Sequence, residues 1–335
     1  MRKFMPVLLC LAFLAQPQPG FAQEKIDITN LTIKAKQGDL WTQNYLGYLY
    51  LTGVPGRIRP DPKLAMVWIG SAAQRGYAEA QTNLALMYAN GQGVRTNHEL
   101  AAKWFLLSAK QNNKTAQYNL GTYYQTGTGV EKNTKEAAKW YGYAAKQNDR
   151  NAQLALAELY MKGDGVEKND VEAVKWLKFA AKQSHPRAQL LLADMYKQNR
   201  AGQDYKPEEL IALYKSAALA GDAEAAARYG IILEKGDEVE KNEKEAVFWL
   251  RKAADMAHPE AQYHLGKMYL EGRGVEKKDL AVAWVWFSLA ANYDGEKQLY
   301  SDARDSTSQL LKPAELEQAQ ALAREWKPKE RPKPK

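Results

Sequence analysis

Four histidines are the side chains of this sequence best suited to acid–base or metal chemistry: His98, His185, His258 and His264. No two of them stand four residues apart, the spacing that places two imidazoles on one helical face to bind zinc. His185 and His258 each precede a proline at equivalent positions of a repeated pattern, so we expect both to begin helices. The histidines therefore predict no metal site and no cofactor.

The sequence also lacks a motif for nucleophilic catalysis. None of the eight serines is followed three residues later by lysine, as a serine β-lactamase requires. The sequence also lacks the Gly-x-Ser-x-Gly turn of hydrolases and the Gly-x-x-x-x-Gly-Lys-Ser/Thr loop that cradles phosphate. Glutamates recur at one position of the repeat, which indicates a structural or solubilising role because a catalytic pair would be placed once: Glu131, Glu167, Glu240 and Glu276. We therefore expect that the protein is not an enzyme.

A tryptophan recurs every 36 residues, at Trp68, Trp104, Trp140 and Trp176. A period of this length is typical of stacked helix pairs, which present a long surface lined by side chains and seldom a closed catalytic pocket. The pattern Ala-Gln-x-x-Leu-x-x-x-Tyr places its Leu and Tyr four residues apart, on one buried stripe of a helix. It predicts seven first helices, at residues 42–50, 80–88, 116–124, 152–160, 188–196, 225–233 and 261–269.

Each first helix leads through a loop into a second helix. The loops read Gly-x-Gly-Val, as at residues 127–130, and glycine suits a helix end because it adopts the left-handed conformation without strain. Asn133 with Glu136 is typical of a capping box that begins the second helix. In that helix Trp140 precedes two alanines by four and five residues, so that neighbouring helices can approach closely. The capping pair recurs at Asn169 with Glu172 and at Asn242 with Glu245.

The run Ala-x-x-Trp-x-x-x-Ala-Ala, the Gly-x-Gly-Val loop and the 36-residue period together resemble the Sel-1-like repeat family, relatives of the tetratricopeptide repeat. The resemblance implies an all-α fold, a right-handed α/α superhelix (solenoid) of seven helix-turn-helix repeats with a C-terminal helical cap. The fifth repeat departs from the pattern, with Tyr214 in place of tryptophan and no glycine loop. The repeats are expected at residues 38–75, 76–111, 112–147, 148–183, 184–220, 221–256 and 257–293.

The first residues predict a secretory signal peptide over residues 1–22, because Arg2-Lys3 precedes an apolar run and small residues lead up to Ala22. The apolar run is about 12 residues, shorter than the roughly 20 that a membrane-spanning helix needs. Cys10, the one cysteine, lies in this leader, so a mature chain has no thiol or disulfide. We expect a periplasmic or secreted protein that does not span the membrane.

The segments that flank the repeats have their own expected roles. Residues 23–37 form an N-terminal capping segment, and residues 294–326 form two capping helices that cover the last repeat. Residues 327–335 are rich in Lys and Pro with nothing apolar to bury, so we expect disorder there. This tail carries +4 of the net charge of +8 and the leader carries +2, which leaves the rest of the chain near balance at +2 and predicts no nucleic-acid partner. The tail has the charge to contact anionic envelope components.

The resemblance to tetratricopeptide repeats implies that the first helices line a concave groove. Residues beside the buried Leu differ between repeats, as a specificity surface requires, and aromatic side chains are the usual anchors of interfaces. Trp41 and Tyr48 have an alternative role, which is to pack against the N-terminal cap. The candidate partner-binding residues are Trp41, Asn44, Tyr48, Tyr118, Thr122, Gln125, Tyr263 and Lys267, with Glu79, Thr82, Glu158, Arg187 and Asp194 around them.

We interpret the chain as a non-enzymatic exported adaptor or scaffold that binds a protein or peptide partner through this groove. Two alternatives stay open. One is a secreted factor that binds a host protein. The other is an envelope hydrolase acting on β-lactams or peptidoglycan, because some cysteine-rich proteins that resemble this family have been assigned β-lactamase activity.

Overall fold

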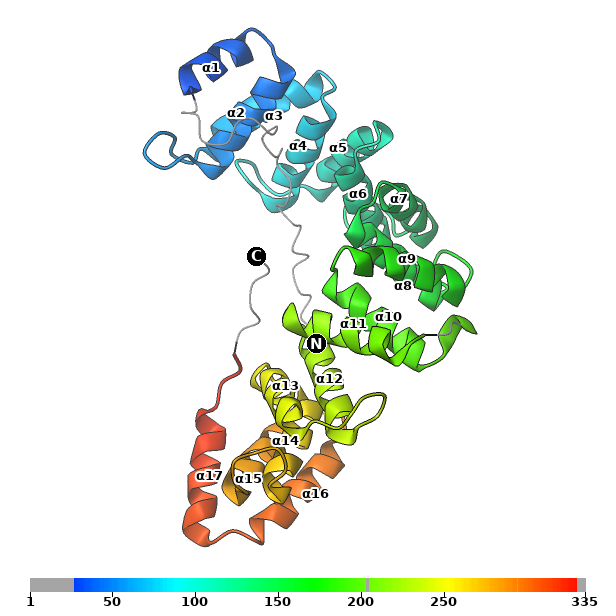
Figure 1. Cartoon of the computed structure of the whole chain (residues 1–335). Helices are drawn as coiled ribbons and strands as arrows, with labels where there is room; N and C mark the ends of the chain where they lie inside the picture. Colours follow the sequence, from blue (N-terminus) through cyan, green and yellow to red (C-terminus); the bar gives the residue numbers. More distant parts are fainter. Residues whose placement is uncertain (1–26, 203–204, 294, 330–335) are drawn as a thin grey trace. The chain divides into compact units, whose positions relative to one another are not determined.

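The computed structural model of the chain describes residues 27–202, 205–293 and 295–329, and these residues form helices and loops with one isolated bridge between Val54 and Ile58 (Figure 1). Two compact units divide the chain, Met1–Trp176 and Leu177–Lys335, and each is described by itself. The expected signal peptide and its cleavage site near Ala22 lie outside the described residues. No helix in the described part is both long and apolar enough to cross a membrane.

Helices of the first unit pack in consecutive pairs (Figure 1). A short leading helix, α1 (Ile28–Lys36), packs on the first pair. The pairs are α2 (Leu40–Thr52) with α3 (Pro62–Gln74), α4 (Ala78–Asn90) with α5 (His98–Lys110), and α6 (Lys114–Thr126) with α7 (Thr134–Lys146), followed by α8 (Arg150–Lys162) and the start of α9 (Asp170–Lys182). The expected all-α architecture of paired helices is confirmed.

The second unit continues the same arrangement. Its pairs are α10 (Pro186–Lys197) with α11 (Pro207–Leu219), α12 (Ala223–Lys235) with α13 (Glu243–Asp255), and α14 (Pro259–Glu271) with α15 (Leu280–Ala290), and a 3-10 turn, η1 (Arg200–Gly202), follows α10. Two further helices, α16 (Lys297–Ser308) and α17 (Pro313–Glu325), pack on α15. The last repeat is thereby covered.

The helices begin at side-chain caps. Asn133 Oδ1 accepts a hydrogen bond from the Glu136 backbone N–H at 3.1 Å, as the capping-box pattern predicted. The reciprocal half of that box was wrong, because the Asn133 N–H donates to the Tyr124 carbonyl at 2.8 Å and ties the loop back to the preceding helix. The Glu136 carboxylate pairs with Lys139. His185 and His258 accept from backbone N–H groups as N-caps, which confirms their expected role.

A buried glutamine explains why the first helices open with Ala-Gln. Gln117 Nε2 donates to the Ala109 carbonyl at 3.2 Å, and its Oε1 accepts from Gln147 Nε2 at 2.7 Å. The side chain thus joins the end of the preceding helix to the end of the next second helix. Five other glutamines donate to the carbonyl eight residues earlier: Gln43, Gln81, Gln153, Gln189 and Gln262.

The two glycines of a Gly-x-Gly-Val loop have different tasks. Gly163 ends α8 in the left-handed conformation, with φ of 71°. Gly165 is left-handed as well, but a Cβ there would meet the backbone of Thr134 at 2.3 Å. Thr134 is the first residue of the previous repeat's second helix, so the second glycine permits contact between repeats. Gly93, Gly129 and Gly274 meet the backbone of Pro62, His98 and Glu243 in the same way.

The segment that follows α17 contacts the last repeats. Trp326 lies edge-on to Trp286, with ring centroids 6.4 Å apart. The tail that was expected to be disordered begins one residue later, and its first three residues are described. Lys329 donates from its backbone N–H to the Asp255 carbonyl at 2.7 Å, and its Nζ lies 2.6 Å from Asp255 Oδ2. Residues 330–335 lie outside the described part.

Candidate binding surfaces

The exposed face of α2 carries a strip of three aromatic rings. Trp41 stacks on Tyr45 with ring centroids 5.0 Å apart and planes 22° apart, and Tyr45 lies 6.4 Å from Tyr48. All three are half-buried, so part of each residue stays accessible to solvent. The sequence analysis chose Trp41 and Tyr48 but missed Tyr45, although its spacing of three and four residues from them predicts one helical face. The strip is a continuous apolar contact surface.

Asn44 does not belong to this exposed strip. Its side chain is buried, and its Oδ1 accepts a hydrogen bond from Asn83 Nδ2 at 2.8 Å. Thr82 is buried as well, with its Oγ1 2.8 Å from Ser108 Oγ. Both residues were expected on the groove surface, and both instead connect neighbouring helices. The physical reason is that another helix packs over each side chain: the next first helix, α4, over Asn44, and the second helix α5 over Thr82.

Three expected contact residues of α6 surround one buried phenol. The hydroxyl of Tyr141 lies 2.8 Å from Gln125 Oε1 and 3.1 Å from Thr122 Oγ1, and its ring lies 5.7 Å from that of Tyr118. Burial raises the pKa of Tyr141 well above its usual value, so the hydroxyl stays a neutral donor. Tyr118, Thr122 and Gln125 are half-buried. Their arrangement suits a pre-ordered polar surface beside an aromatic ring.

The expected contact residues of the second unit lie on α10 and α14. Tyr263 packs against Tyr300 of the C-terminal cap at 5.2 Å between centroids, and Lys267 Nζ lies 5.8 Å from the Tyr263 ring. The cap therefore covers part of Tyr263. Asp194 accepts a hydrogen bond from Tyr214 at 2.7 Å. Arg187 is exposed, as is Glu79 of the first unit, and Glu158 is half-buried.

A buried ion cluster of the second unit was not predicted from the sequence. Glu234, with 5% of its surface exposed, lies 2.5 Å from His264 Nδ1 through one oxygen and 2.8 Å from Arg273 Nη2 through the other. Burial by itself would raise the pKa of Glu234, but the hydrogen bonds from His264 and Arg273 outweigh it and lower the pKa to about 2. The cluster joins α12 to α14 and to the loop after α14. Its contacts indicate a structural role.

Acid should weaken the second unit through Glu234. Its folded pKa of about 2 lies below the ordinary value of 4.5, so the stabilisation is complete above pH 4.5 and is lost as pH falls toward 2. We expect Glu234→Gln to remove a pH-dependent part of the unfolding free energy on the order of 2–3 kcal/mol. Urea unfolding at pH 7, 4 and 2.5 measures it, with Glu240→Gln as the exposed control. Equal pH dependence in wild type and Glu234→Gln would contradict the assignment.

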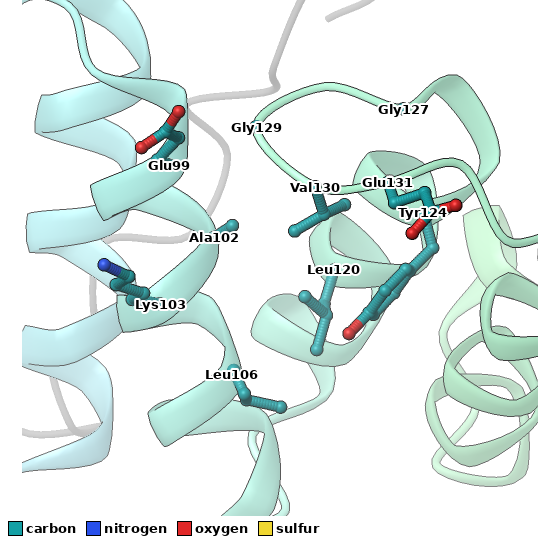
Figure 2. Close-up of a pocket in the computed structure, with 10 residues that line it drawn as sticks. All are labelled: Glu99, Ala102, Lys103, Leu106, Leu120, Tyr124, Gly127, Gly129, Val130 and Glu131. Atoms are coloured by element: carbon teal, nitrogen blue, oxygen red, sulfur yellow. The ribbon is translucent and has the colours of Figure 1, made fainter.

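Two hollows lie at equivalent places of successive repeats, beside second helices. The first, of about 550 Å³, lies between α5, α6 and the following loop, and Figure 2 shows Leu106, Leu120 and Val130 pointing into it. The second, of about 570 Å³, lies 36 residues later between α7, α8 and the start of α9. We call the first the neighbouring pocket and the second the lysine pocket, because four of the residues that line it are lysines. The sequence analysis missed both.

The described residues contain no group of three or more His, Cys, Asp or Glu side chains placed to hold a metal ion. The polar side chains of the strip, of α6 and of the two pockets are amides, hydroxyls, lysines and glutamates. Such groups donate and accept hydrogen bonds and pair with charges. The arrangement can therefore recognise a partner.

The paired helices and the recurring loops define a helical repeat protein of the tetratricopeptide-like class. The Sel1 repeat family profile matches residues 42–77, 78–113, 114–149, 150–185, 223–258 and 259–292, more than half of the chain. The protein therefore belongs to the Sel1 repeat family. The span between the fourth and fifth matches holds α10 and α11, where Tyr214 stands in place of tryptophan.

Known proteins resemble the chain to different extents. A crystal structure of a Sel1 repeat protein from Oxalobacter formigenes aligns with a TM-score of 0.65 and 29% identity, over 85% of this chain and 80% of that one. A protective antigen of uropathogenic Escherichia coli aligns at 24% identity over 90% of this chain and 94% of that one, with a TM-score of 0.32. Chitin synthase regulator SKT5 of Saccharomyces cerevisiae is 32% identical over 93 residues, which are 27% of this chain and 13% of the yeast protein. The match thus spans about an eighth of that relative.

Proposed function

We propose that the protein is an exported, non-enzymatic scaffold that binds a protein or peptide partner through the exposed face of its first helices. The observation that carries the proposal is a contrast within the repeat. Positions that join the helices recur, such as the glutamine of Ala-Gln, whereas exposed first-helix positions change. The place of Trp41 is taken by Glu79 in the next repeat, and that of Tyr48 by Thr122 and Glu158 in later ones. Variable surface positions on a constant helical scaffold are suited to binding one specific partner.

The aromatic strip of α2 is the proposed anchor of this interaction. Trp and Tyr are enriched among the residues that dominate interface energies, because they bury a large area at modest entropic cost. Trp41 already stacks on Tyr45, and Tyr48 lies beside Tyr45, so these contacts reduce the side-chain freedom that binding would remove. Sel1 and tetratricopeptide-like repeats typically mediate protein interactions.

The proposed compartment is the periplasm or the extracellular space. The support is the leader pattern of residues 1–22, with Arg2-Lys3, an apolar run and a small-residue site near Ala22. The mature chain lacks cysteine, so an oxidising compartment would leave its covalent structure unchanged. The basic tail is proposed to make at most a weak contact with anionic envelope components.

The double variant Trp41→Ala with Tyr48→Ala tests the proposed face. We expect recovery of the partner from a crosslinked envelope extract to fall at least about tenfold, since an anchor residue contributes about 2 kcal/mol to binding. Both rings are half-buried on the outside of α2, so circular dichroism should show an unchanged fold. Val67→Ala is the matched control, because Val67 is an apolar residue of α3 with 64% of its surface exposed.

Equal recovery of the partner by the double variant and by the wild type would show that the partner does not bind at the aromatic strip of α2.

The proposal that the protein is not an enzyme has its own test, which is turnover of nitrocefin or of peptidoglycan fragments by the pure protein. Turnover abolished by one point substitution would overturn the scaffold proposal in favour of an envelope hydrolase. The outcomes of the two assays are independent, because the first measures binding of a partner and the second measures catalytic turnover.

A further inference from the structure

We propose that the lysine pocket binds an acidic peptide segment that inserts one large apolar side chain between its lysines. The pocket lies in the first unit and is lined by parts of α7, α8, the loop after α8 and the start of α9. None of its lining residues belongs to the aromatic strip or to the polar group around Tyr141. The inference is therefore independent of the proposed role of the first-helix face.

A glycine lines the lysine pocket at the position where the neighbouring pocket has a leucine, and the two hollows have similar volumes, about 570 and about 550 Å³. In the neighbouring pocket Leu106 extends toward Leu120 (Figure 2). The equivalent residue 36 positions later is Gly142, and a Cβ added there would meet no atom within 4 Å. The floor beneath this opening is apolar, formed by Leu156 and Val166 with Ala138. An apolar group of a ligand can therefore reach the floor.

The rim of the pocket carries an excess of positive charge. Lys135, Lys139, Lys146 and Lys175 line it together with a single carboxylate, Glu172. Glu172 pairs with Lys175 at 3.0 Å, but the lysine remains 53% exposed, and exposed ion pairs of this kind are weak. Lys139 pairs with Glu136 at 3.4 Å and is 51% exposed, and Lys135 and Lys146 are exposed at the surface as well. The rim thus attracts anions.

The repeat does not require a lysine at the position of Lys135. In the neighbouring pocket Glu99 occupies the place of Lys135, and the remaining charged lining residues are Lys103 and Glu131. Its floor is otherwise alike, since Leu120 and Leu156 are equivalent. Lys139 and Lys146 have counterparts one repeat earlier in Lys103 and Lys110, so Lys135 is the charge that distinguishes this pocket. Because the fold tolerates a glutamate at that position, Lys135 points to a ligand for this pocket.

An acidic peptide fits the combination of an apolar floor and a basic rim. In an extended segment successive side chains point to opposite sides, so an aromatic side chain can enter the pocket while flanking carboxylates reach the rim. The volume of about 570 Å³ lies within the range of small-ligand sites. Tyr143, with 43% of its surface exposed, and Trp176 offer rings beside the opening. A flat anionic membrane would meet the lysines but leave the floor empty.

Fluorescence anisotropy with a fluorescein-labelled peptide, Gly-Asp-Glu-Phe-Glu-Asp-Gly, tests the proposal on the mature protein. We expect Gly142→Leu to weaken binding at least about tenfold, because its side chain would extend into the open space above the apolar floor that the phenylalanine of the peptide needs. Leucine is a better helix former than glycine, so the melting temperature should not fall. Lys135→Glu with Lys146→Glu should weaken binding by a similar factor. Lys110→Glu with Lys132→Glu, which changes the net charge equally at exposed positions outside the pocket, should leave it within about twofold.

Three results would overturn the proposal. The first is no measurable binding of the acidic phenylalanine peptide. The second is equal binding of a peptide with serine in place of phenylalanine, which would show attraction to charge without insertion. The third is binding to vesicles of anionic lipid that Gly142→Leu leaves unchanged, with no binding of the peptide. Loss of binding in Gly142→Leu together with an unchanged melting temperature supports insertion into the pocket.

Discussion

Replacing Trp140 with alanine should lower the free energy of unfolding by about 3–5 kcal/mol. The ring is 8% exposed and packs in one cluster with Phe105, Leu120 and Tyr123 of the preceding helices. Its removal leaves a cavity between two repeats, and each repeat is stabilised chiefly by its neighbours. Urea unfolding followed by circular dichroism measures the loss. Broadening of the transition would show that adjacent helix pairs no longer unfold together.

Trp140→Phe is the control for this substitution. The indole Nε1 is buried without a hydrogen-bond partner among the described residues, so phenylalanine removes an unsatisfied donor while keeping an aromatic ring. We expect a loss of less than about half that of the alanine variant. A loss below about 1 kcal/mol for Trp140→Ala would show that this ring is not the core residue its spacing indicates.

Gly165→Ala should be about as damaging, at about 4 kcal/mol, although it adds a single methyl group. The residue has φ of 74°, where an L side chain is strained, and its Cβ would lie 2.3 Å from the Thr134 backbone. The loop or the first turn of α7 must move to accept it. Both adjustments disturb the contact between two repeats. Thermal unfolding of the mature protein measures the effect.

Gly163→Ala separates backbone strain from steric contact as causes of the loss, because the added methyl group has the same backbone strain but a longer distance to its nearest neighbour. Its φ is 71°, and the nearest atom to an added Cβ is Lys168 Cβ at 3.1 Å, a tight contact but a much longer one than the 2.3 Å at Gly165. We expect a loss of only about 1–2 kcal/mol, the cost of a left-handed L residue. Equal losses for Gly163→Ala and Gly165→Ala would show that the second glycine serves conformation alone and not contact between repeats.

Much of the fold was predictable because its signals are local and repeated. A helix cap such as Asn133 acts on an N–H three residues away, and a helix-ending glycine such as Gly163 acts on the last turn. The Leu and Tyr of a first helix reveal its buried side through a spacing of one turn. The candidate surface was less predictable. Trp41 and Tyr48 lie on the expected exposed face, whereas Asn44, at a neighbouring position, is covered by the next first helix.

The sequence by itself determined the helix pairs, the places where they begin and end, and the large residues of their core. These depend on backbone conformation and side-chain spacing within a few residues, which the 36-residue period repeats. Tertiary structure decided what lies between repeats: the bond from Gln147 to Gln117, the approach of Gly165 to Thr134 and the openness of the lysine pocket. Each of these joins groups on different helices. Their distances follow from how the helices pack, and no local pattern of residues encodes that packing.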